Sequence, residues 1–542
     1  MPNNVDLFWQ YLPTSNSTAL AITLCLATII CFVVFTRELT PLRNVPGPFL
    51  ASLSNIWLFR QTKTFQRPLI DMELHKRYGP IVRIGPKEVM VSSPSSLKTI
   101  YGAGSAFKKA DWYIAVTDCG WGGPDRLSLL GEKNMEKYRL QRRNLGPAYT
   151  VDAVKDYEEN LDSILEQNIN TMREQSGTAY DLDNFLNFFT SDCLSGLTLG
   201  TSKSLLKSQV DDGTIGGIHH AWMYMHVVGF FPLIHRANTA FKVLMTSPTI
   251  ISFQKCVRAC IPAILRRVDD EQGNPNPYKF QMDLISNRLS NKPTESSLKP
   301  PKDVLDKLLH LQLTRPTLKD KDHWIQSMAL TNFGAGVETT AITIGFLIDN
   351  IISHPGCQQK VHAEIDQAHR DGELPAGKVL KVRDIQDHLP YLNACLKESM
   401  RLHSVVGMPL PRAVPEGGVT LEGYMIPAGT TVGINSWVLG RDKSLYSEDA
   451  EEWRPERWLE YSSEKLKQLE SYNFSFGAGA RSCPGKHLAQ AIYLKAIPML
   501  FDHFEWRFRD STPEKKIQCT FSTRYVGLMV QWKERKTAVE HD

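Results

Sequence analysis

The chain has 542 residues and a formal net charge of +4. The charges are spread along it, which argues against a nucleic-acid-binding protein. Its ten cysteines are scattered and form no CxxC pair, so we expect free thiols in a reducing compartment and neither a disulfide framework nor a zinc site. No repeat or low-complexity linker interrupts the sequence after about residue 50, which predicts one large domain behind an N-terminal segment.

That N-terminal segment is a candidate membrane anchor. Residues 18–36 are uncharged and mostly apolar, TALAITLCLATIICFVVFT, and are about as long as a membrane-spanning helix needs to be. Residues 1–17 carry no Lys or Arg, whereas Arg37 and Arg43 follow the apolar run. This asymmetry predicts a lumenal N-terminus and a cytoplasmic globular part. It also argues against a cleaved signal peptide, which would begin with basic residues.

Two smaller features flank the anchor. Asn16-Ser17-Thr18 is a glycosylation sequon that would lie on the lumenal side. Residues 37–50 contain PLRNVPGP, and because prolines fix φ and restrict their predecessors, we expect a stiff hinge there. The globular domain is then residues 51–542.

A glycine-rich stretch near the C-terminus surrounds one cysteine. It reads FSFGAGARSCPGKHLA from Phe474 to Ala489, with Cys483 near its end. Its glycines permit tight turns, and we expect a helix to begin at Pro484. A cysteine before a helix N-terminus feels the positive end of the helix dipole, which favours the thiolate. Such a thiolate, with Arg481 for an anionic group, suits a haem, with sulfur bound to iron and guanidinium to a propionate.

For a bare Cys-x-Gly, the simpler alternative is an ordinary turn before a helix. The complete spacing argues against such a turn, because the stretch resembles the haem-binding signature of cytochrome P450 monooxygenases at each defined position: Phe476, Gly479, Arg481, Cys483 and Gly485. The resemblance covers nearly the whole chain. It implies a mainly α fold with small β-sheets, preceded by one transmembrane helix, with residues 51–542 as the catalytic domain. It also implies haem b as cofactor, with Cys483 as the axial ligand of the iron.

A long, largely apolar helix is predicted from about residue 321 to 350, and a buried helix needs a reason for polar residues in its middle. The interruption AGVETT resembles the family's oxygen-binding motif. By this resemblance, Ala335 and Gly336 make room for dioxygen, Thr339 hydrogen-bonds it, and Glu338 relays protons. The alternative is a kink-forming Thr beside a buried, paired Glu.

Other motifs gain meaning from the resemblance. Glu398 and Arg401 share a helical face, and with Arg457 they are implied to form a buried ion network that braces the haem side. Arg142 and Arg412 match residues that bind haem propionates. Tyr138 stands where the family usually has Trp or His, four residues before Arg142, and its hydroxyl could also reach a propionate. For Arg142, the alternative is a solvent-facing basic helix.

The substrate cavity is assigned by region. A C-terminal hairpin, CTFSTRYVGLMVQW, is expected to reach back into it with its tip, and residues 216–233, rich in aromatic residues and Met, are expected to form its roof. The residues that we expect to line the cavity are Phe333, Val405, Val406, Met408, Phe521 and Ser522.

The resemblance implies a monooxygenase that uses dioxygen and electrons from NADPH. No GxGxxG fingerprint is present, so the electrons are expected from a separate NADPH-cytochrome P450 reductase, with cytochrome b5 as a further partner, at the endoplasmic reticulum membrane. Phrases such as NVPGPFLASLSNIWLF and FKKADWY are similar to filamentous-fungal members, including the pisatin demethylase-like group, which indicates an apolar substrate in secondary-metabolite biosynthesis.

Two alternatives stay open at this point. The same haem-thiolate site could carry out desaturation, ring coupling or a redox-neutral rearrangement, although the intact Glu338-Thr339 pair argues for oxygen activation. A non-catalytic haem-binding membrane protein is the other alternative, and it has no need of a proton relay.

Overall fold

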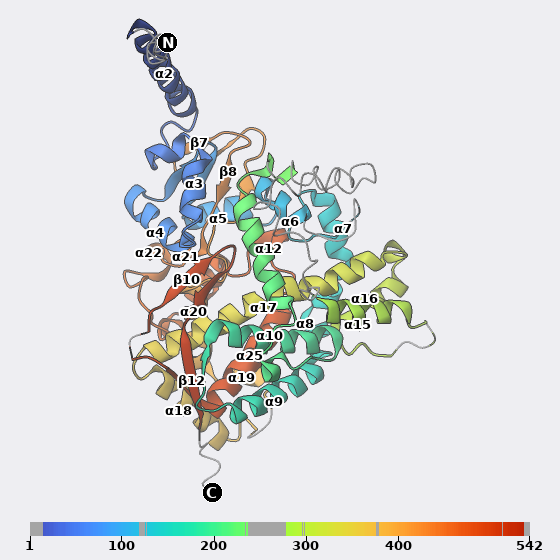
Figure 1. Ribbon diagram of the computed structural model, residues 1–542. Coiled ribbons are helices and arrows are strands. Elements are labelled where there is room, and N and C mark those ends of the chain that lie inside the picture. The colour runs from blue at the N-terminus through green and yellow to red at the C-terminus, as the bar shows by residue number, and fades with distance from the viewer. Residues whose placement is uncertain are drawn as a thin grey trace, which may run out of the picture.

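The computed structural model describes residues 15–118, 125, 127–233, 235–236, 278–294, 296, 299–375, 379–511 and 513–535. Across these residues helices dominate, and the strands form four small sheets (Figure 1). The mainly α fold with small β-sheets predicted from the sequence is therefore confirmed.

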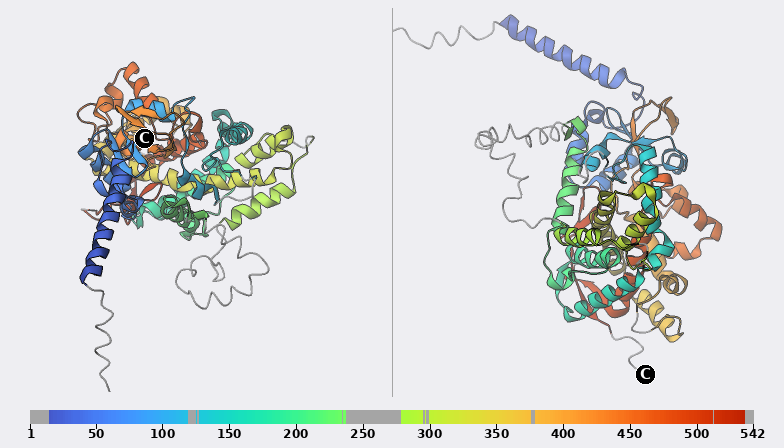
Figure 2. Two further views of the ribbon diagram at one scale, coloured as in Figure 1. Left: turned by 90° about the horizontal axis from the view of Figure 1, so that it is seen from above. Right: turned by 90° about the vertical axis from the view of Figure 1, so that its right-hand side faces the viewer.

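The apolar N-terminal run forms one helix that stands clear of the globule in each view (Figures 1 and 2). It is α2 (Ser15–Val33), which continues as the π-helical turn η1 (Val34–Glu38). The stretch Leu20–Glu38 is long and apolar enough to cross a membrane, and none of its most apolar window is buried. The sequon residue Asn16 lies in the first turn of this helix.

The proline-rich segment after the anchor packs on the globule. Leu42 and Val45 are buried in a small apolar cluster with Ile81 of the first sheet. Arg83 of the same strand donates hydrogen bonds to the carbonyl oxygens of Thr36 at 3.0 Å and Leu42 at 3.4 Å. The start of the hinge is thus fixed to the sheet by both apolar burial and hydrogen bonds.

The largest sheet has five strands in the order β1-β2-β8-β5-β3. Pairing is antiparallel throughout except between β2 and β8, which are parallel. The strands are β1 (Ile81–Gly85), β2 (Glu88–Val91), β8 (Thr431–Gly433), β5 (Arg412–Ala413) and β3 (Lys108–Lys109). This register sets Lys109 opposite Arg412, which matters for the site described below.

Three smaller sheets complete the β structure of the described residues. One has the order β4-β12-β9, and the other two are hairpins. Their strands are β4 (Ala179–Asp181), β12 (Met529–Glu534) and β9 (Phe504–Phe508), β6 (Val419–Leu421) with β7 (Tyr424–Ile426), and β10 (Lys516–Cys519) with β11 (Thr523–Val526).

The core is organised around α17 (Asp322–Ser353), which crosses the middle of the molecule (Figure 1). It packs against α10 (Leu182–Leu199), α20 (Pro390–Leu402) and α25 (Lys486–His503). Most of α17 and nearly all of α10 is buried, as expected for helices that are apolar on most faces.

The remaining elements surround this core. The other helices are α3 (Asn55–Thr62), α4 (Arg67–Tyr78), α5 (Pro94–Tyr101), α6 (Ile114–Asp118), α7 (Met135–Leu145), α8 (Val151–Lys155), α9 (Glu158–Glu174), α11 (Leu205–Ser208), α12 (Thr214–Val228), α15 (Lys279–Ser290), α16 (Val304–Thr314), α18 (Cys357–Arg370), α19 (Val382–His388), α21 (Ser436–Leu439), α22 (Lys443–Tyr446), α23 (Arg457–Glu460) and α24 (Ser463–Tyr472). Short 3₁₀ turns are η2 (Phe49–Ser52), η3 (Asp111–Tyr113), η5 (Gly146–Tyr149), η7 (Pro316–Leu318) and η8 (Gly479–Arg481).

One predicted boundary was wrong. The helix after the cysteine begins at Lys486, and Pro484 lies in the turn before it. The backbone N–H of Cys483 donates to the carbonyl oxygen of Phe476 at 2.8 Å, which closes the loop through the cysteine and delays the helix by two residues.

Candidate functional site

The loop that carries Cys483 connects α24 to α25, and its shape depends on glycine. Gly477 and Gly479 have φ of 68° and 60°, in the left-handed region that other residues rarely adopt. A Cβ on Gly479 would lie 2.3 Å from the carbonyl oxygen of Tyr101, so the loop also needs glycine for its close approach to α5. Gly485 differs, because a Cβ there meets nothing within 4 Å.

Cys483 is exposed on one side to a cavity of about 560 Å³, with protein on its other sides. The backbone N–H groups of Gly485 and Lys486 and the charge of Arg142 lower the pKa of its thiol, as expected at a helix start. Burial is the larger effect, however, and the net pKa is raised. The helix start and Arg142 thus favour the thiolate, as predicted, whereas the protein around the thiol favours its protonated form.

Two arginines near the cysteine have donors without partners. The guanidinium of Arg481 lies over the ring of Tyr138, 3.8 Å from its centroid, and its Nη1 and Nη2 are buried without a hydrogen bond. Nη1 of Arg142, on α7, is also buried and unpartnered. The hydroxyl of Tyr138 donates to the carbonyl oxygen of Ala480 at 2.9 Å. Tyr138 thus uses its proton to hold the loop, and its ring positions Arg481.

Two further basic side chains, Arg412 and Lys109, lie near Arg481. Arg412 packs between the rings of Tyr101 and Tyr113 and donates to the Tyr113 hydroxyl at 3.3 Å. Lys109 lies opposite it on β3 and donates to the carbonyl oxygens of Leu129 and Leu130. Burial, and then the charges of Arg481 and Arg412, hold the pKa of Lys109 well below its usual range. Sequence reasoning missed Lys109, because its relation to Arg412 arises from strand pairing.

This arrangement fits a haem. Lys109, Arg412 and Arg481 form no ion pair with any carboxylate in the described part of the chain, and buried cations without counter-charges are costly. A ligand with two carboxylates would satisfy the free guanidinium donors. The residues that would hold the group are Cys483 at the iron and Arg142, Arg412, Arg481 and Lys109 at the propionates.

The predicted oxygen-binding motif lies in the middle of α17. Ala335 is exposed there between buried turns. The hydroxyl of Thr339 donates to the carbonyl oxygen of Ala335 at 2.6 Å, so its proton is used inside the helix and its lone pairs remain to accept. Gly336 faces α10, where a Cβ would come within 2.9 Å of Leu194. The missing Cβ of Gly336 permits this close helix packing, and its expected role in making room for dioxygen stays a prediction.

Glu338 is buried and lies in a polar cluster that the sequence did not reveal. Its Oε1 is 3.8 Å from Nε2 of His219, on α12, and its Oε2 has no partner. Arg524, on β11, joins this cluster by donating to Asp183 at 2.8 Å and to His219 at 3.0 Å. Helices α10, α12 and α17 and the C-terminal hairpin therefore meet at Glu338.

The surroundings disfavour the charged forms of Glu338 and His219. Burial, followed by the charge of Asp183, raises the pKa of Glu338 to about 7, and Arg524 opposes the shift. The nearby hydroxyl of Ser522 opposes it as well, although it makes no hydrogen bond of normal geometry. Burial and Arg524 lower the pKa of His219 to about 4. Burial thus disfavours the ionised form of Glu338.

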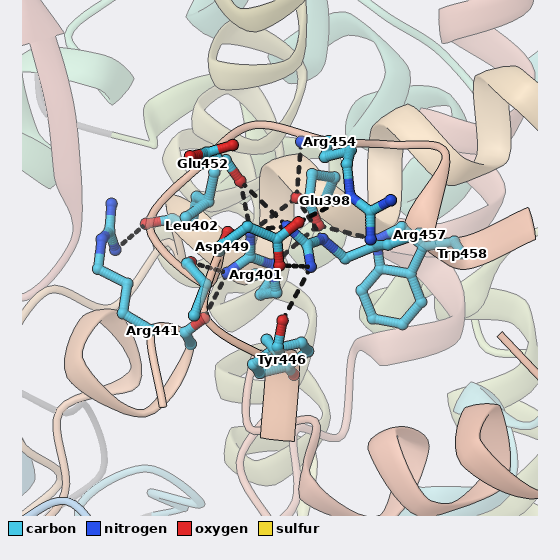
Figure 3. Close-up of polar contacts among 12 residues, drawn as sticks. Glu398, Arg401, Leu402, Arg441, Tyr446, Asp449, Glu452, Arg454, Arg457 and Trp458 are labelled. Carbon is cyan, nitrogen blue, oxygen red and sulfur yellow. Dashed lines mark hydrogen bonds and ion pairs between the residues drawn. The ribbon is translucent and has the colours of Figure 1, made fainter. Parts of the chain in front are cut away.

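Figure 3 shows a buried ion network centred on Glu398. Glu398 accepts from Arg401 Nη2 at 2.6 Å and Nε at 2.8 Å, and from Arg457 Nε at 3.0 Å. Trp458 Nε1 and the backbone N–H of Arg454 also donate to Glu398, at 2.9 and 3.0 Å. Arg401 lines the cavity at Cys483. The structure thus brings together the three charged residues that the sequence singled out.

The predicted substrate-cavity residues separate into two groups. The hairpin tip does reach back: Phe521 stacks on Trp222 at 4.8 Å and on Trp112 at 5.8 Å, and Ser522 pairs with Val406 by a β-bridge. The N–H of Thr523 donates to the carbonyl oxygen of Val405 at 2.8 Å. Phe333, by contrast, is fully buried in the core, so the expectation that it lines a cavity is wrong.

Met408 lines a second cavity, of about 360 Å³, beside the five-stranded sheet. It was predicted as a substrate-cavity residue, and it does face open space.

Comparison with known proteins agrees with this geometry. Residues 46–534 match the family model for cytochrome P450. The chain is similar to the cytochrome P450 monooxygenase sdnT of Sordaria araneosa, with 30% identity over 94% of each chain. It is also similar to a pisatin demethylase of Fusarium vanettenii, with 30% identity over 90% of this chain and 88% of that one. In fold it resembles the crystal structure of a cytochrome P450 (CYP102L1), with a TM-score of 0.66, 20% identity and 91% and 99% of the two chains covered.

Proposed function

Because the chain belongs to the cytochrome P450 monooxygenase family, we propose that it oxidises an apolar small molecule at a haem held by Cys483. The observation that carries the proposal is the group of unpartnered guanidinium donors of Arg142 and Arg481 beside that cysteine. When bound, the haem would supply oxygen activation, and Cys483 would hold its iron as an electron-donating thiolate.

The chain's own residues would position substrate and protons. Thr339 keeps its hydroxyl lone pairs free to accept a hydrogen bond from water or a protonated oxygen, because its proton is donated to Ala335. Glu338, with a pKa of about 7, can take up and release a proton at neutral pH. His219 and Arg524 hold the cluster in which that carboxyl lies.

The electrons are proposed to come from NADPH through a separate flavoprotein reductase, with cytochrome b5 as a further donor. Helix α2 is suited to anchor the enzyme in a membrane, and we place it in the endoplasmic reticulum with the catalytic domain in the cytoplasm and Asn16 in the lumen. Similarity to fungal monooxygenases and to a pisatin demethylase supports a substrate from fungal specialised metabolism, hydroxylated or otherwise oxidised.

The first experiment is the difference spectrum of the ferrous–CO adduct. The wild type should show the red-shifted band of a thiolate ligand, and Cys483→Ala should lose it. Cys31→Ala is the matched control, since Cys31 is also exposed but lies in α2. Retention of the band by Cys483→Ala, or its absence from haem-loaded wild type, would exclude Cys483 as the ligand.

Turnover then tests the reaction class. NADPH-dependent oxidation in the presence of reductase should incorporate one labelled oxygen atom from O₂ into the product. A product that forms without labelled oxygen would favour desaturation, ring coupling or rearrangement over oxygen insertion.

A further inference from the structure

The second cavity, of about 360 Å³, lies between the five-stranded sheet and the segment after α12. Its walls are largely apolar and include Trp112, Met408 and Val432. Two charged side chains from different elements also line it: Arg67 of α4 and Glu88 of β2. Both have unused hydrogen-bonding capacity.

Arg67 is held firmly but only partly satisfied. It is 3% exposed, and its Nε donates to Oδ1 of Asp71 at 2.6 Å. Asp71 is fixed in turn by Asn435, whose Nδ2 donates to Oδ2 at 2.9 Å. Of the terminal nitrogens, Nη2 approaches only the thioether of Met90, at 3.5 Å, and Nη1 makes no hydrogen bond with any residue that the structure describes. The guanidinium is therefore held in a fixed position and still has N–H donors available for a ligand.

Glu88 complements it. Its carboxyl makes no hydrogen bond and no ion pair within the described ranges. Burial raises its pKa to about 7, and the charge of Arg67 opposes that shift. The two groups thus influence each other electrostatically, yet they are too far apart to form an ion pair. Asp71 is engaged by Arg67 and Asn435, and the other charged groups lining the cavity are Lys87 and Asp111.

We propose that this cavity is a subsite for an oxygenated end of the substrate, in which an alcohol hydroxyl bridges the two groups, accepting from Arg67 and donating to Glu88. A hydroxyl is the simplest group that does both. A carboxylate would be opposed by an ionised Glu88, and an ammonium group by Arg67. The apolar walls would take the adjoining hydrocarbon.

The subsite adjoins a stack of aromatic side chains that reaches α12. Trp112 lines the cavity and also stacks on Phe521, which stacks on Trp222 of α12. A hydrocarbon bound in the cavity can therefore continue along this stack at the hairpin tip. The inference rests on the proposed function and narrows it: the substrate already carries a hydroxyl, which an earlier oxidation, hydration, carbonyl reduction or ester hydrolysis supplies.

The test is calorimetric binding of cyclododecanol and cyclododecane to the full-length, haem-loaded protein in phospholipid nanodiscs. Wild type should bind the alcohol about tenfold more tightly, the value of one good hydrogen bond to a buried group. Glu88→Leu should bring the two affinities close together without weakening the hydrocarbon. Glu88→Gln retains both a donor and an acceptor, so it should keep the preference within about threefold.

Lys87→Ala, which removes the neighbouring charge at the same cavity, is the matched control and should leave the ratio unchanged. Three results would each overturn the proposal: equal affinities of wild type for the alcohol and the hydrocarbon, no binding of the alcohol, or an unchanged ratio of the two affinities in Glu88→Leu. The cavity would then be one that only water fills. The ferrous–CO spectrum of the same samples separates this failure from that of the proposed function, because it reports on Cys483 alone.

Discussion

Replacing Glu398 with alanine would leave two buried arginines without their shared counter-charge. Glu398 and Arg457 are 0% exposed and Arg401 is 6% exposed. Five hydrogen bonds end on this one carboxylate: two from Arg401 and one each from Arg457, Trp458 and the backbone of Arg454.

Backbone oxygens would still hold part of each guanidinium. Arg401 donates to the carbonyl of Glu452 at 2.9 Å, and Arg457 to that of Tyr446 at 2.9 Å. Arg457 would also keep the carboxylate of Asp449 at 3.0 Å, whereas Arg401 would keep only neutral carbonyl oxygens. We therefore expect a loss of about 3 kcal/mol in the free energy of unfolding, the lower end for a broken buried ion pair. This is a large share of the 5–15 kcal/mol that stabilises a typical domain.

Urea unfolding followed by tryptophan fluorescence measures the effect. Glu398→Gln, which keeps one acceptor oxygen, should fall between wild type and alanine. Glu460→Gln breaks an exposed pair with Arg454 and is the matched control, with an expected loss below about 1 kcal/mol. A loss for Glu398→Ala no larger than that of the control would refute the view that this network braces the cysteine side.

Three further predictions test the site. Gly479→Ala should destabilise the protein by about 2 kcal/mol or more in urea unfolding and reduce haem retention, because φ is 60° and the new Cβ would lie 2.3 Å from the Tyr101 carbonyl oxygen. Gly485→Ala is the control and should have a much smaller effect, because a Cβ there meets open space. Equal effects of the two substitutions would contradict this reasoning. Tyr138→Phe should lower the free energy of unfolding by about 1 kcal/mol, because it loses the hydrogen bond to Ala480, but its ring should keep Arg481 in place. Tyr138→Leu should also weaken haem binding, measured by haem transfer to apomyoglobin. Identical haem affinity in the two variants would argue against the stacking role. The folded-state pKa of Glu338, about 7, exceeds its unfolded value, so wild type should lose on the order of 2 kcal/mol of stability as pH rises from 5 to 8. Glu338→Gln lacks this titration and should therefore gain stability relative to wild type over the same range. A pH-independent difference between the two proteins in melting experiments would show that the carboxyl is not desolvated.

Local sequence was sufficient where the determinant is local. The run of apolar residues after residue 18 has the length and composition of a spanning helix whatever the rest of the chain does, and α2 has those properties. The spacing around Cys483 likewise predicted a glycine-dependent loop before a helix, and Gly477 and Gly479 adopt the left-handed conformations that such a loop requires.

Sequence was insufficient where a neighbour from elsewhere in the chain decides the outcome. The motif singled out Gly336, but only the structure shows that its missing Cβ makes room for Leu194 of α10. The net pKa of Cys483 depends on how much protein surrounds the loop, and here burial outweighs the helix N-terminus.

The amino-acid sequence by itself determined the helix periods, the turn glycines and the identity of the charged residues in each motif, because these depend on neighbours a few residues apart. Only the tertiary structure decided which of them meet. It set Lys109 opposite Arg412 through strand pairing, brought His219 and Arg524 to Glu338, and left Arg67 and Glu88 facing one cavity without touching. Such contacts join residues tens to hundreds of positions apart, and their geometry is fixed only when the layers pack.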